Sequence, residues 1–443
     1  MGGSKDYQNS PLLQMVRAQK QGKPVGMYSI CSANRFVIEA CMLEAAKREA
    51  PVLIESTSNQ VNQYGGYTGM KPADFAAFAR GIAAGIGFPA ERIILGGDHL
   101  GPNAWQHEPA ATAMAKANVM IGDYVAAGFV KIHLDASMRC ADDPGNIHTP
   151  LLEETVAARA AELCRSAEEA FARGAHVAHA PLYVIGTEVP IPGGAQETEE
   201  TVSVTKVADV ERTIGISGDA FAGIKQQAAW ERVIALVVQP GVEYGDSTVF
   251  GYQHAKAEAL SSFIHRHGQL VFEAHSTDYQ LREALQEMVR DHFAVLKVGP
   301  WLTFALREAL FALEAMETEW LAGRGDISLS RLWETVENVM LAHPADWQKH
   351  YHGDEHDQAY ARKYSYSDRV RYYWGRPALD AAVAKLIANL TSRPAPLSLL
   401  SQFMPRQYRA VREGEISNLP LDLIRHKIRE VAGIYSEATE PNP

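Results

Sequence analysis

The sequence predicts a (β/α)8 barrel followed by a helical extension. Eight short apolar runs of strand length recur up to Pro300, and several are near-continuous runs of Val, Ile and Leu. Such runs are typical of parallel strands that are covered on both faces. Stretches with apolar residues at spacings of three and four separate most of the runs, which indicates alternating strands and helices. A further helical stretch after the eighth run, Leu302 to Glu319, favours a closed barrel over an open sheet.

The expected elements follow in order along the chain. The strands are expected at Pro24 to Ile30, Pro51 to Thr57, Arg92 to Asp98, Phe129 to Asp135, Pro181 to Glu188, Val233 to Gly241, Leu270 to Ser276 and Phe293 to Pro300. Helices such as Asn34 to Arg48, Pro72 to Gly85, Leu151 to Arg173 and Tyr279 to Arg290 are long enough for right-handed crossovers. The alternation stops after about Gly323. We therefore predict a barrel over residues 1–322 and a helical extension over residues 323–443.

The composition is that of an ordinary globular protein, with 47% hydrophobic and 21% charged residues among 443. A net charge of -11 makes nucleic acid and anionic membranes unfavourable partners. The four cysteines form no C-x-x-C pair, which suits a reducing cytoplasm. Because the chain has no basic leader and no apolar run of about 18 residues, we expect neither export nor a membrane span.

Polar side chains stand at the predicted C-terminal ends of the strands, where barrels of this type carry their chemistry. The second to seventh strands end near Glu55, Asp98 and His99, Asp135, Glu188, Glu243, and His275, in that order. Any one of these carboxylates could simply cap a helix or pair with a lysine. Together they converge on one rim, where like charges are costly to desolvate unless a cation or substrate lies among them.

This mixture of side chains predicts a divalent metal ion. Imidazole combined with carboxylate suits Zn, Mn or Co better than Mg or Ca, and we expect Zn first. The candidate ligands are His99, Glu188, Glu243 and His275. An ordinary hydrogen-bonded histidine is the alternative for His99 and for His275. An ion with an open coordination position would polarise a carbonyl, as carbon-carbon cleavage beside a ketone requires.

Several longer motifs resemble the class II, metal-dependent tagatose-bisphosphate aldolase group, and most closely the subunit family usually described as its non-catalytic partner. The matching stretches are Glu55 to Gln63, Gly65 to Met70, Gly97 to Asn103, Glu273 to Gln280 and Tyr364 to Trp374. The resemblance runs over nearly the whole chain. It implies a phosphorylated ketohexose of galactitol and tagatose catabolism as substrate, and a class II aldolase catalytic subunit as a possible partner. We also expect a homo-oligomer.

The resemblance to the catalytic aldolases is more distant and runs strand by strand. Asp98 and His99 resemble their acid and first metal-binding histidine, and Glu188 resembles their second-shell or alternative-site glutamate. Two departures matter. Their G-x-x-H-G segment is Gln239 to Glu243 here, and their H-G-A-S segment is Glu273 to Ser276. Either Glu243 and His275 take over as ligands, or the metal site is altered or lost.

The same resemblance suggests how a phosphate would bind. Ser276 matches a serine of the aldolase phosphate cradle, and Lys297 to Gly299 resembles the K-V-N of the phosphate loop after the eighth strand. The expected substrate-binding residues are Asn59, Ser276, Thr277, Lys297, Gly299 and Arg369. A helix cap is the alternative for Ser276, and a surface charge for Lys297. Arg369 either anchors the extension or clamps phosphate through bidentate hydrogen bonds.

The chemistry that would follow is cleavage and re-formation of a C3-C4 bond, which serves an aldolase and a 4-epimerase equally. The expected general base is Asp98, with Glu55 and Asp135 as alternatives. The competing function is an accessory subunit that stabilises a separate class II aldolase, which the missing strand-six histidine favours. A sugar-phosphate kinase is poorly supported, because the sequence has no G-x-x-x-x-G-K-S/T loop.

Overall fold

Eight parallel strands close into a barrel, as the sequence predicts. A computed structural model of the chain describes residues 7–145, 150–174, 179–186 and 202–440. The barrel order is β1-β10-β9-β6-β5-β4-β3-β2. The strands are β1 (Met27–Cys31), β2 (Val52–Thr57), β3 (Ile93–Leu100), β4 (Lys131–Leu134), β5 (Leu182–Ile185), β6 (Val233–Val238), β9 (Val271–Ala274) and β10 (Phe293–Val298). A small antiparallel pair, β7 (Glu243–Tyr244) and β8 (Val249–Phe250), lies outside the barrel.

The barrel strands are buried because both of their faces are covered. Every residue of β6 and of β10 is buried. One apolar cluster, which includes Leu53, Val237 and Val295, lies towards the N-terminal end of the barrel. Helix α1 (Pro11–Lys20) contributes to the same cluster through Leu12 and its neighbours, so this helix plugs the N-terminal end of the barrel. The opposite end, where the strands finish, is left for polar side chains.

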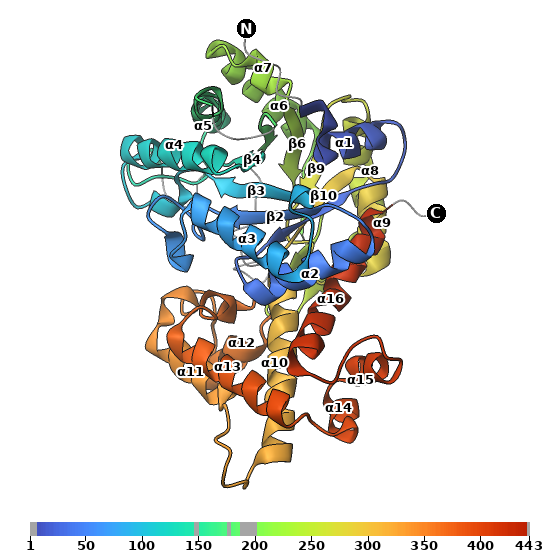
Figure 1. The fold of residues 1–443 in the computed structure, drawn as a ribbon. Coiled ribbons are helices and arrows are strands. Elements are labelled where there is room, and N and C mark those ends of the chain that lie inside the picture. The colour runs from blue at the N-terminus through green and yellow to red at the C-terminus, as the bar shows by residue number, and fades with distance from the viewer. Residues whose placement is uncertain (1–6, 146–149, 175–178, 187–201, 441–443) are drawn as a thin grey trace.

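Helices surround the barrel in chain order (Figure 1). They are α2 (Arg35–Lys47), α3 (Pro72–Ile86), α4 (Ala110–Ala126), α5 (Glu153–Ala172), α6 (Val207–Gly223), the short α7 (Gln227–Trp230), α8 (His254–His265) and α9 (Arg282–Arg290). Their buried faces are rich in Ala, Val, Ile and Leu and form the main core between helices and strands. No helix within the described part of the chain is long and apolar enough to cross a membrane.

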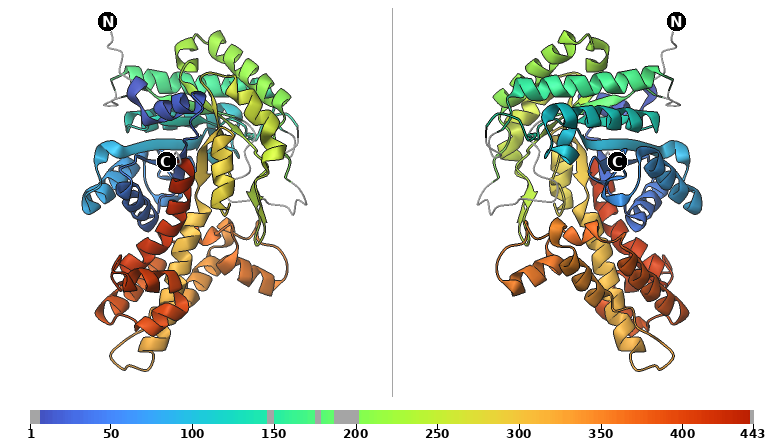
Figure 2. Two further views of the ribbon diagram at one scale, coloured as in Figure 1. Left: turned by 90° about the vertical axis from the view of Figure 1, so that its right-hand side faces the viewer. Right: turned by 90° about the vertical axis from the view of Figure 1, so that its left-hand side faces the viewer.

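The last helix of the chain returns to the barrel. Helix α10 (Pro300–Leu321) leaves the C-terminal end of β10 and extends away from the barrel, and α16 (Pro420–Thr439) runs back beside it (Figures 1 and 2). Helix α16 packs against α2, α9 and α10. The backbone N–H of Gly26, just before β1, donates to the carbonyl of Thr439 at 2.8 Å. Helix α16 therefore fills the place between α2 and α9 that an eighth barrel helix would occupy.

The rest of the extension lies beyond the C-terminal ends of the strands (Figure 2). It comprises α11 (Leu332–Ala342), α12 (Glu355–Tyr364), α13 (Pro377–Ser392), α14 (Leu397–Phe403) and α15 (Pro405–Arg412). Two contacts bring it over the barrel mouth: the Tyr279 hydroxyl donates to the carbonyl of Tyr366 at 2.7 Å, and the rings of Tyr67 and Tyr372 lie 5.1 Å apart. The predicted boundary between barrel and extension at residue 322 stays a prediction. The structure shows in addition that α16, from the extension, packs back onto the barrel.

Candidate metal centre and active site

Three histidines and one aspartate meet at the C-terminal end of the barrel. Asp98 and His99 lie on β3, His133 lies on β4, and His275 directly follows β9. One possible ligand atom from each residue lies within 4.8 Å of the others. The four residues are 3%, 4%, 0% and 7% exposed, in the same order. This is a compact, buried set of nitrogen and oxygen donors.

A backbone irregularity in β3 explains how two consecutive residues enter the same cluster. In a regular strand Asp98 and His99 would point to opposite faces. Here the pairing of β3 with β4 shifts register between Gly97 and Leu100, and His99 has a positive φ of 47°. This left-handed conformation is uncommon for a residue other than glycine and is often found at functional positions. The irregularity therefore places both side chains inside the barrel mouth.

Carboxylates orient two of the three imidazole rings. His99 Nδ1 lies 2.8 Å from Asp135 Oδ2, which leaves Nε2 as the remaining ring nitrogen. His275 Nε2 lies 3.0 Å from Glu273 Oε1, which leaves Nδ1. A carboxylate that accepts one ring N–H and so directs the other nitrogen to a metal is a recurrent arrangement in metal sites. Both rings are therefore held as metal ligands usually are.

His133 completes the set with a nitrogen that lacks a partner. His133 Nδ1 lies 3.1 Å from Asp98 Oδ1, and when Nδ1 donates its proton to this carboxylate, Nε2 keeps its lone pair. The backbone N–H of His99 also faces Nδ1 at 3.2 Å, and acceptance of that N–H would place the ring proton on Nε2 instead. His133 Nε2 is fully buried and has no hydrogen-bond partner among the described residues. A buried polar atom without a partner calls for a specific explanation. A metal ion bound at this nitrogen would supply one.

The cluster carries the charges that a cation requires. Burial raises the pKa of Asp98, but His99, Lys297 and His133 outweigh burial and hold the pKa well below its usual range. Burial lowers the pKa of His275 to about 4. Near neutral pH, Asp98 is therefore a carboxylate and His275 a neutral imidazole. These two groups are in protonation states that bind metal. Burial lowers the pKa of His99, but Asp98 and Asp135 outweigh burial and raise it, so the His99 ring must release a proton when an ion binds.

A layer of buried ion pairs lies next to the histidines. Lys131 Nζ lies 2.6 Å from Glu55 and 2.6 Å from Glu273, and all three side chains are 0% exposed. Lys297 Nζ pairs with Glu55 and lies 2.9 Å from Asp98. Burial lowers the pKa of Lys297, but Asp98 and the other surrounding acidic groups outweigh burial and hold the pKa well above its usual range. Both lysines are therefore ammonium ions that balance the carboxylates inside the barrel.

A second group of possible ligands, Cys31, Glu55 and Asp98, adjoins the first. The Lys297 ammonium pairs with both carboxylates of this group, so a lysine already occupies the cation position. Burial raises the pKa of the Cys31 thiol well above its usual range, even though Lys297 opposes this shift. The group is best described as part of the ion-pair layer.

The structure places the predicted catalytic and metal residues as follows. Asp98, His99 and His275 meet in the cluster. Asp135 orients His99, and Glu55 is held by two lysines. Glu243, on β7, lies outside the cluster, and its Oε1 accepts from the backbone N–H of Tyr244 at 3.0 Å. Glu188 lies outside the described residues.

His133 is a candidate ligand that the sequence prediction did not include. Lys131, His133 and Asp135 alternate along β4 and its end, and a period of two places alternate residues on the same face of a strand. The polar alternation was a signal that all three side chains face the barrel interior. Both His133 and Asp135 belong to the polar end of the predicted strand, but the sequence prediction gave a role to Asp135 alone.

The predicted phosphate-binding residues do not form one open cradle. Asn59 is exposed, and Ser276 is partly buried with a positive φ of 53°. The Thr277 hydroxyl donates to the carbonyl of Lys297 at 2.6 Å. Lys297 itself pairs with carboxylates, and the backbone N–H of Gly299 donates to Asp278 at 3.1 Å.

Arg369 is engaged within the extension. Its guanidinium donates to the carbonyl of Asp346 at 2.8 Å and lies over the ring of Tyr372 at 5.7 Å. The side chain is largely buried, and its backbone N–H donates to the Tyr351 hydroxyl at 3.2 Å. These contacts are those of an anchor, and the phosphate clamp stays a prediction.

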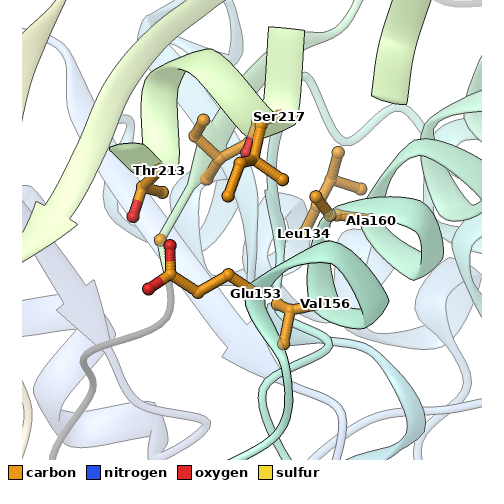
Figure 3. Close-up of a pocket in the computed structure, with 10 residues that line it drawn as sticks. Leu134, Glu153, Val156, Ala160, Thr213 and Ser217 are labelled. Atoms are coloured by element: carbon orange, nitrogen blue, oxygen red, sulfur yellow. The ribbon is translucent and has the colours of Figure 1, made fainter. Parts of the chain in front are cut away.

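A cavity elsewhere in the described structure lacks comparable chemistry. It lies between α5 and α6 outside the barrel and is lined by Leu134, Val156, Ala160 and Ser217, with Glu153 at one side (Figure 3). Its volume of about 10 Å³ is the room of a single water molecule. This cavity therefore offers no competing site.

Gly101 provides a test of how closely β3 and β4 must approach to build the site. A Cβ atom at Gly101 would lie 1.6 Å from the backbone oxygen of Asp135. Gly101→Ala must therefore push apart the two strand ends that carry His99 and Asp135. We expect the free energy of unfolding to fall by about 3 kcal/mol, as measured by urea unfolding.

The matched control is Gly81→Ala. Gly81 lies within α3 and is exposed, and a Cβ atom there would meet nothing within 4 Å. Alanine at this position should stabilise the protein by about 0.5–1 kcal/mol. Wild-type stability of the Gly101→Ala variant would show that the two strand ends tolerate separation.

Comparison with known proteins places the chain in context. A family model described as D-tagatose-1,6-bisphosphate aldolase subunit GatZ/KbaZ-like matches residues 12–440. A probable tagatose 6 phosphate kinase from Sinorhizobium meliloti 1021 has a similar crystal structure, with 46% identity and a TM-score of 0.85 over 93% of this chain and 100% of that chain. The YdjI aldolase from Escherichia coli K12 aligns over 82% of this chain and 94% of that chain, with 10% identity and a TM-score of 0.41.

Proposed function

The chain belongs to the D-tagatose-1,6-bisphosphate aldolase subunit GatZ/KbaZ-like family, as its motifs predicted, and on this premise we propose that it is an enzyme in its own right. The proposed reaction breaks and re-forms the C3-C4 bond of a phosphorylated ketohexose with the help of a divalent metal ion. The observation that carries the proposal is the buried cluster of Asp98, His99, His133 and His275 at the catalytic end of the barrel.

The donor set fits a transition metal. His99 and His275 each have one ring nitrogen held by a carboxylate, and His133 Nε2 is buried without a partner. Three imidazoles with an adjacent carboxylate suit Zn, Mn or Co. We propose the three histidines as the ligands, with Zn as the first candidate. When bound, such an ion would polarise the ketone carbonyl and stabilise the negative charge that cleavage leaves on the ketone fragment.

The protein side chains supply proton transfer and orientation. Asp98 is ionised, and we propose that it takes the proton of the C4 hydroxyl as the C3-C4 bond breaks. The bonding electron pair stays on the fragment that contains C3, and the other fragment becomes an aldehyde at C4. When the bond re-forms, Asp98 returns the proton to the C4 oxygen. Asp135 keeps the His99 ring in position throughout.

The fate of the aldehyde decides the overall reaction. If the aldehyde leaves, the reaction is an aldol cleavage. If the aldehyde rotates and presents its other face before the bond re-forms, C4 is inverted, and tagatose and fructose phosphates interconvert. The same residues serve both outcomes, so the site supports an aldolase and a 4-epimerase alike.

The test uses the purified protein alone. Metal analysis should find about one transition-metal ion per chain, because the proposed ligands form one site. Fructose 6-phosphate and tagatose 6-phosphate should interconvert without a partner, and a chelator should stop the reaction. A protein without metal, and without turnover of either sugar, would refute the proposal.

The family description also names a subunit, and this favours a second candidate function. In that case the chain would stabilise a separate class II aldolase polypeptide. No sugar phosphate would then react with the chain alone, and activity would appear only on mixing with a catalytic class II subunit. The kinase description belongs to the Sinorhizobium protein, whereas the present sequence lacks a G-x-x-x-x-G-K-S/T loop.

A further inference from the structure

The N-terminus of α10 stands where many barrels bind a phosphate group. In such barrels the loops after the seventh and eighth strands, together with a helix N-terminus, form the phosphate site. Free backbone N–H groups there point at the anion. In this chain the corresponding strands are β9 and β10, and the helix is α10. Whether this end can accept a phosphate depends on which of its N–H groups are free.

The carboxylate of Asp278 already occupies this helix end. Asp278 Oδ1 accepts the backbone N–H of Gly299 at 3.1 Å and that of Trp301 at 2.8 Å. The side chain is 3% exposed. A carboxylate on the loop after β9 therefore makes the contacts that a phosphate oxygen would otherwise make.

The remaining positions of the first turn offer no free donor. Pro300 has no backbone N–H. The backbone N–H groups of Leu302 and Thr303 both donate to the carbonyl of Gly299, at 3.1 and 3.3 Å. Each backbone N–H from Gly299 to Thr303 thus has an acceptor inside the protein.

The neighbouring side-chain donors are also engaged. The Thr277 hydroxyl donates to the carbonyl of Lys297, and the Lys297 ammonium pairs with Glu55 and Asp98. The Thr303 hydroxyl donates to Asp368 at 2.6 Å. These residues therefore offer a phosphate dianion neither a free cation nor a free hydrogen-bond donor. The dianion would also lie next to the negative charge of Asp278, and such like-charge contacts are costly.

From this geometry we infer that Asp278 is a specificity-determining residue that restricts the substrate to a ketohexose with a single phosphate. The inference rests on the proposed function and narrows it. A 1,6-bisphosphate needs an anion site at each end of the sugar, and the end that lies over β9 and β10 must be uncharged. Because the proposed function acts on 6-phosphates, we assign the uncharged end to C1, and the favoured substrates are therefore ketohexose 6-phosphates. Cleavage of the C3-C4 bond then gives dihydroxyacetone and glyceraldehyde 3-phosphate, and their recombination gives 4-epimerisation.

The experiment measures binding of two ligands to the metal-loaded protein by isothermal titration calorimetry. D-fructose 6-phosphate should bind at least about tenfold more tightly than D-fructose 1,6-bisphosphate. Asp278→Ala removes the carboxylate and frees the N–H groups of Gly299 and Trp301. In this variant the affinity for the bisphosphate, relative to that for the 6-phosphate, should rise by about tenfold or more.

Asp354→Ala is the matched control. Asp354 caps α12 by accepting the N–H groups of His356 and Asp357, at 2.8 and 3.0 Å, in an exposed part of the extension. Loss of this helix cap should leave the ratio of dissociation constants unchanged. The wild-type ratio needs no variant, so the inference remains testable even if Asp278→Ala does not fold.

The outcomes separate the inference from the function on which it rests. If wild-type protein binds the 6-phosphate but binds the bisphosphate as tightly or more tightly, Asp278 does not exclude the second phosphate and the inference is wrong. A folded Asp278→Ala variant with the wild-type ratio would also overturn it. If neither ligand binds, the proposed function itself fails, and the inference fails with it.

Discussion

Replacing His99, His133 or His275 by alanine should remove both the metal ion and turnover. Each substitution deletes one of three proposed nitrogen ligands, and a bound ion supplies several kcal/mol of charge stabilisation to such a reaction. We therefore expect turnover of the ketohexose phosphates to fall by at least about a thousandfold. Metal content measured on the same samples should fall in parallel.

His107→Ala is the control for these variants, because the His107 side chain is 74% exposed and lies outside the cluster. It should keep wild-type metal content and rate. The three ligand variants should remain folded by circular dichroism, since strand-end residues at this face serve chemistry more than packing. Full metal content in any of them would remove that histidine from the proposed ligand set.

Lys131→Met should destabilise the whole barrel. The substitution leaves Glu55 and Glu273 buried without the ammonium that lies 2.6 Å from each. Removing one partner from a buried ion pair costs about 3–5 kcal/mol, because the remaining charge stays in a poorly polar interior. Urea unfolding should show a loss of this size, and for a marginally stable protein it would abolish soluble expression at elevated temperature.

The control is Lys47→Met. Lys47 forms a surface pair with Glu415 at 3.0 Å, in which the side chains are 49% and 43% exposed. Such pairs contribute about 0–1 kcal/mol, so this variant should stay close to wild type. If Lys131→Met lowered the free energy of unfolding as little as Lys47→Met, the prediction would be wrong. Protons or water would then have replaced the lysine beside the two carboxylates.

The sequence predicted the barrel well because each strand carries a local signal. The apolar run of β6 is continuous, and that of β10 is interrupted only by Lys297. Gln239 after β6, and Gly299 and Pro300 after β10, mark where these strands end. The family assignment was likewise available from long motifs. The position of α16 was not, because packing between residues far apart in sequence leaves no local pattern. Amphipathicity shows that a helix has a buried face and does not show which surface covers that face.

The candidate site was predictable only in part, for a similar reason. Asp98, His99 and His275 stand at strand ends, where position alone suggested a role. The engagement of Gly299 by Asp278 depends on the conformation of a loop, and Lys297 could not be distinguished from a phosphate ligand without the two carboxylates that surround it. Spacing identifies which residues reach the rim. Which of them are already neutralised by a neighbour is a property of the folded protein.

The return of α16 has a consequence for how the molecule assembles. The faces of α2 and α9 that this helix covers stay open until residues 420–439 have been made and have docked. Contacts between the two ends of a chain are slow to form, since a long loop must first close. During synthesis the nearly complete barrel should therefore expose an apolar seam to chaperones, and a ribosome stalled before residue 420 should hold it in a protease-sensitive state.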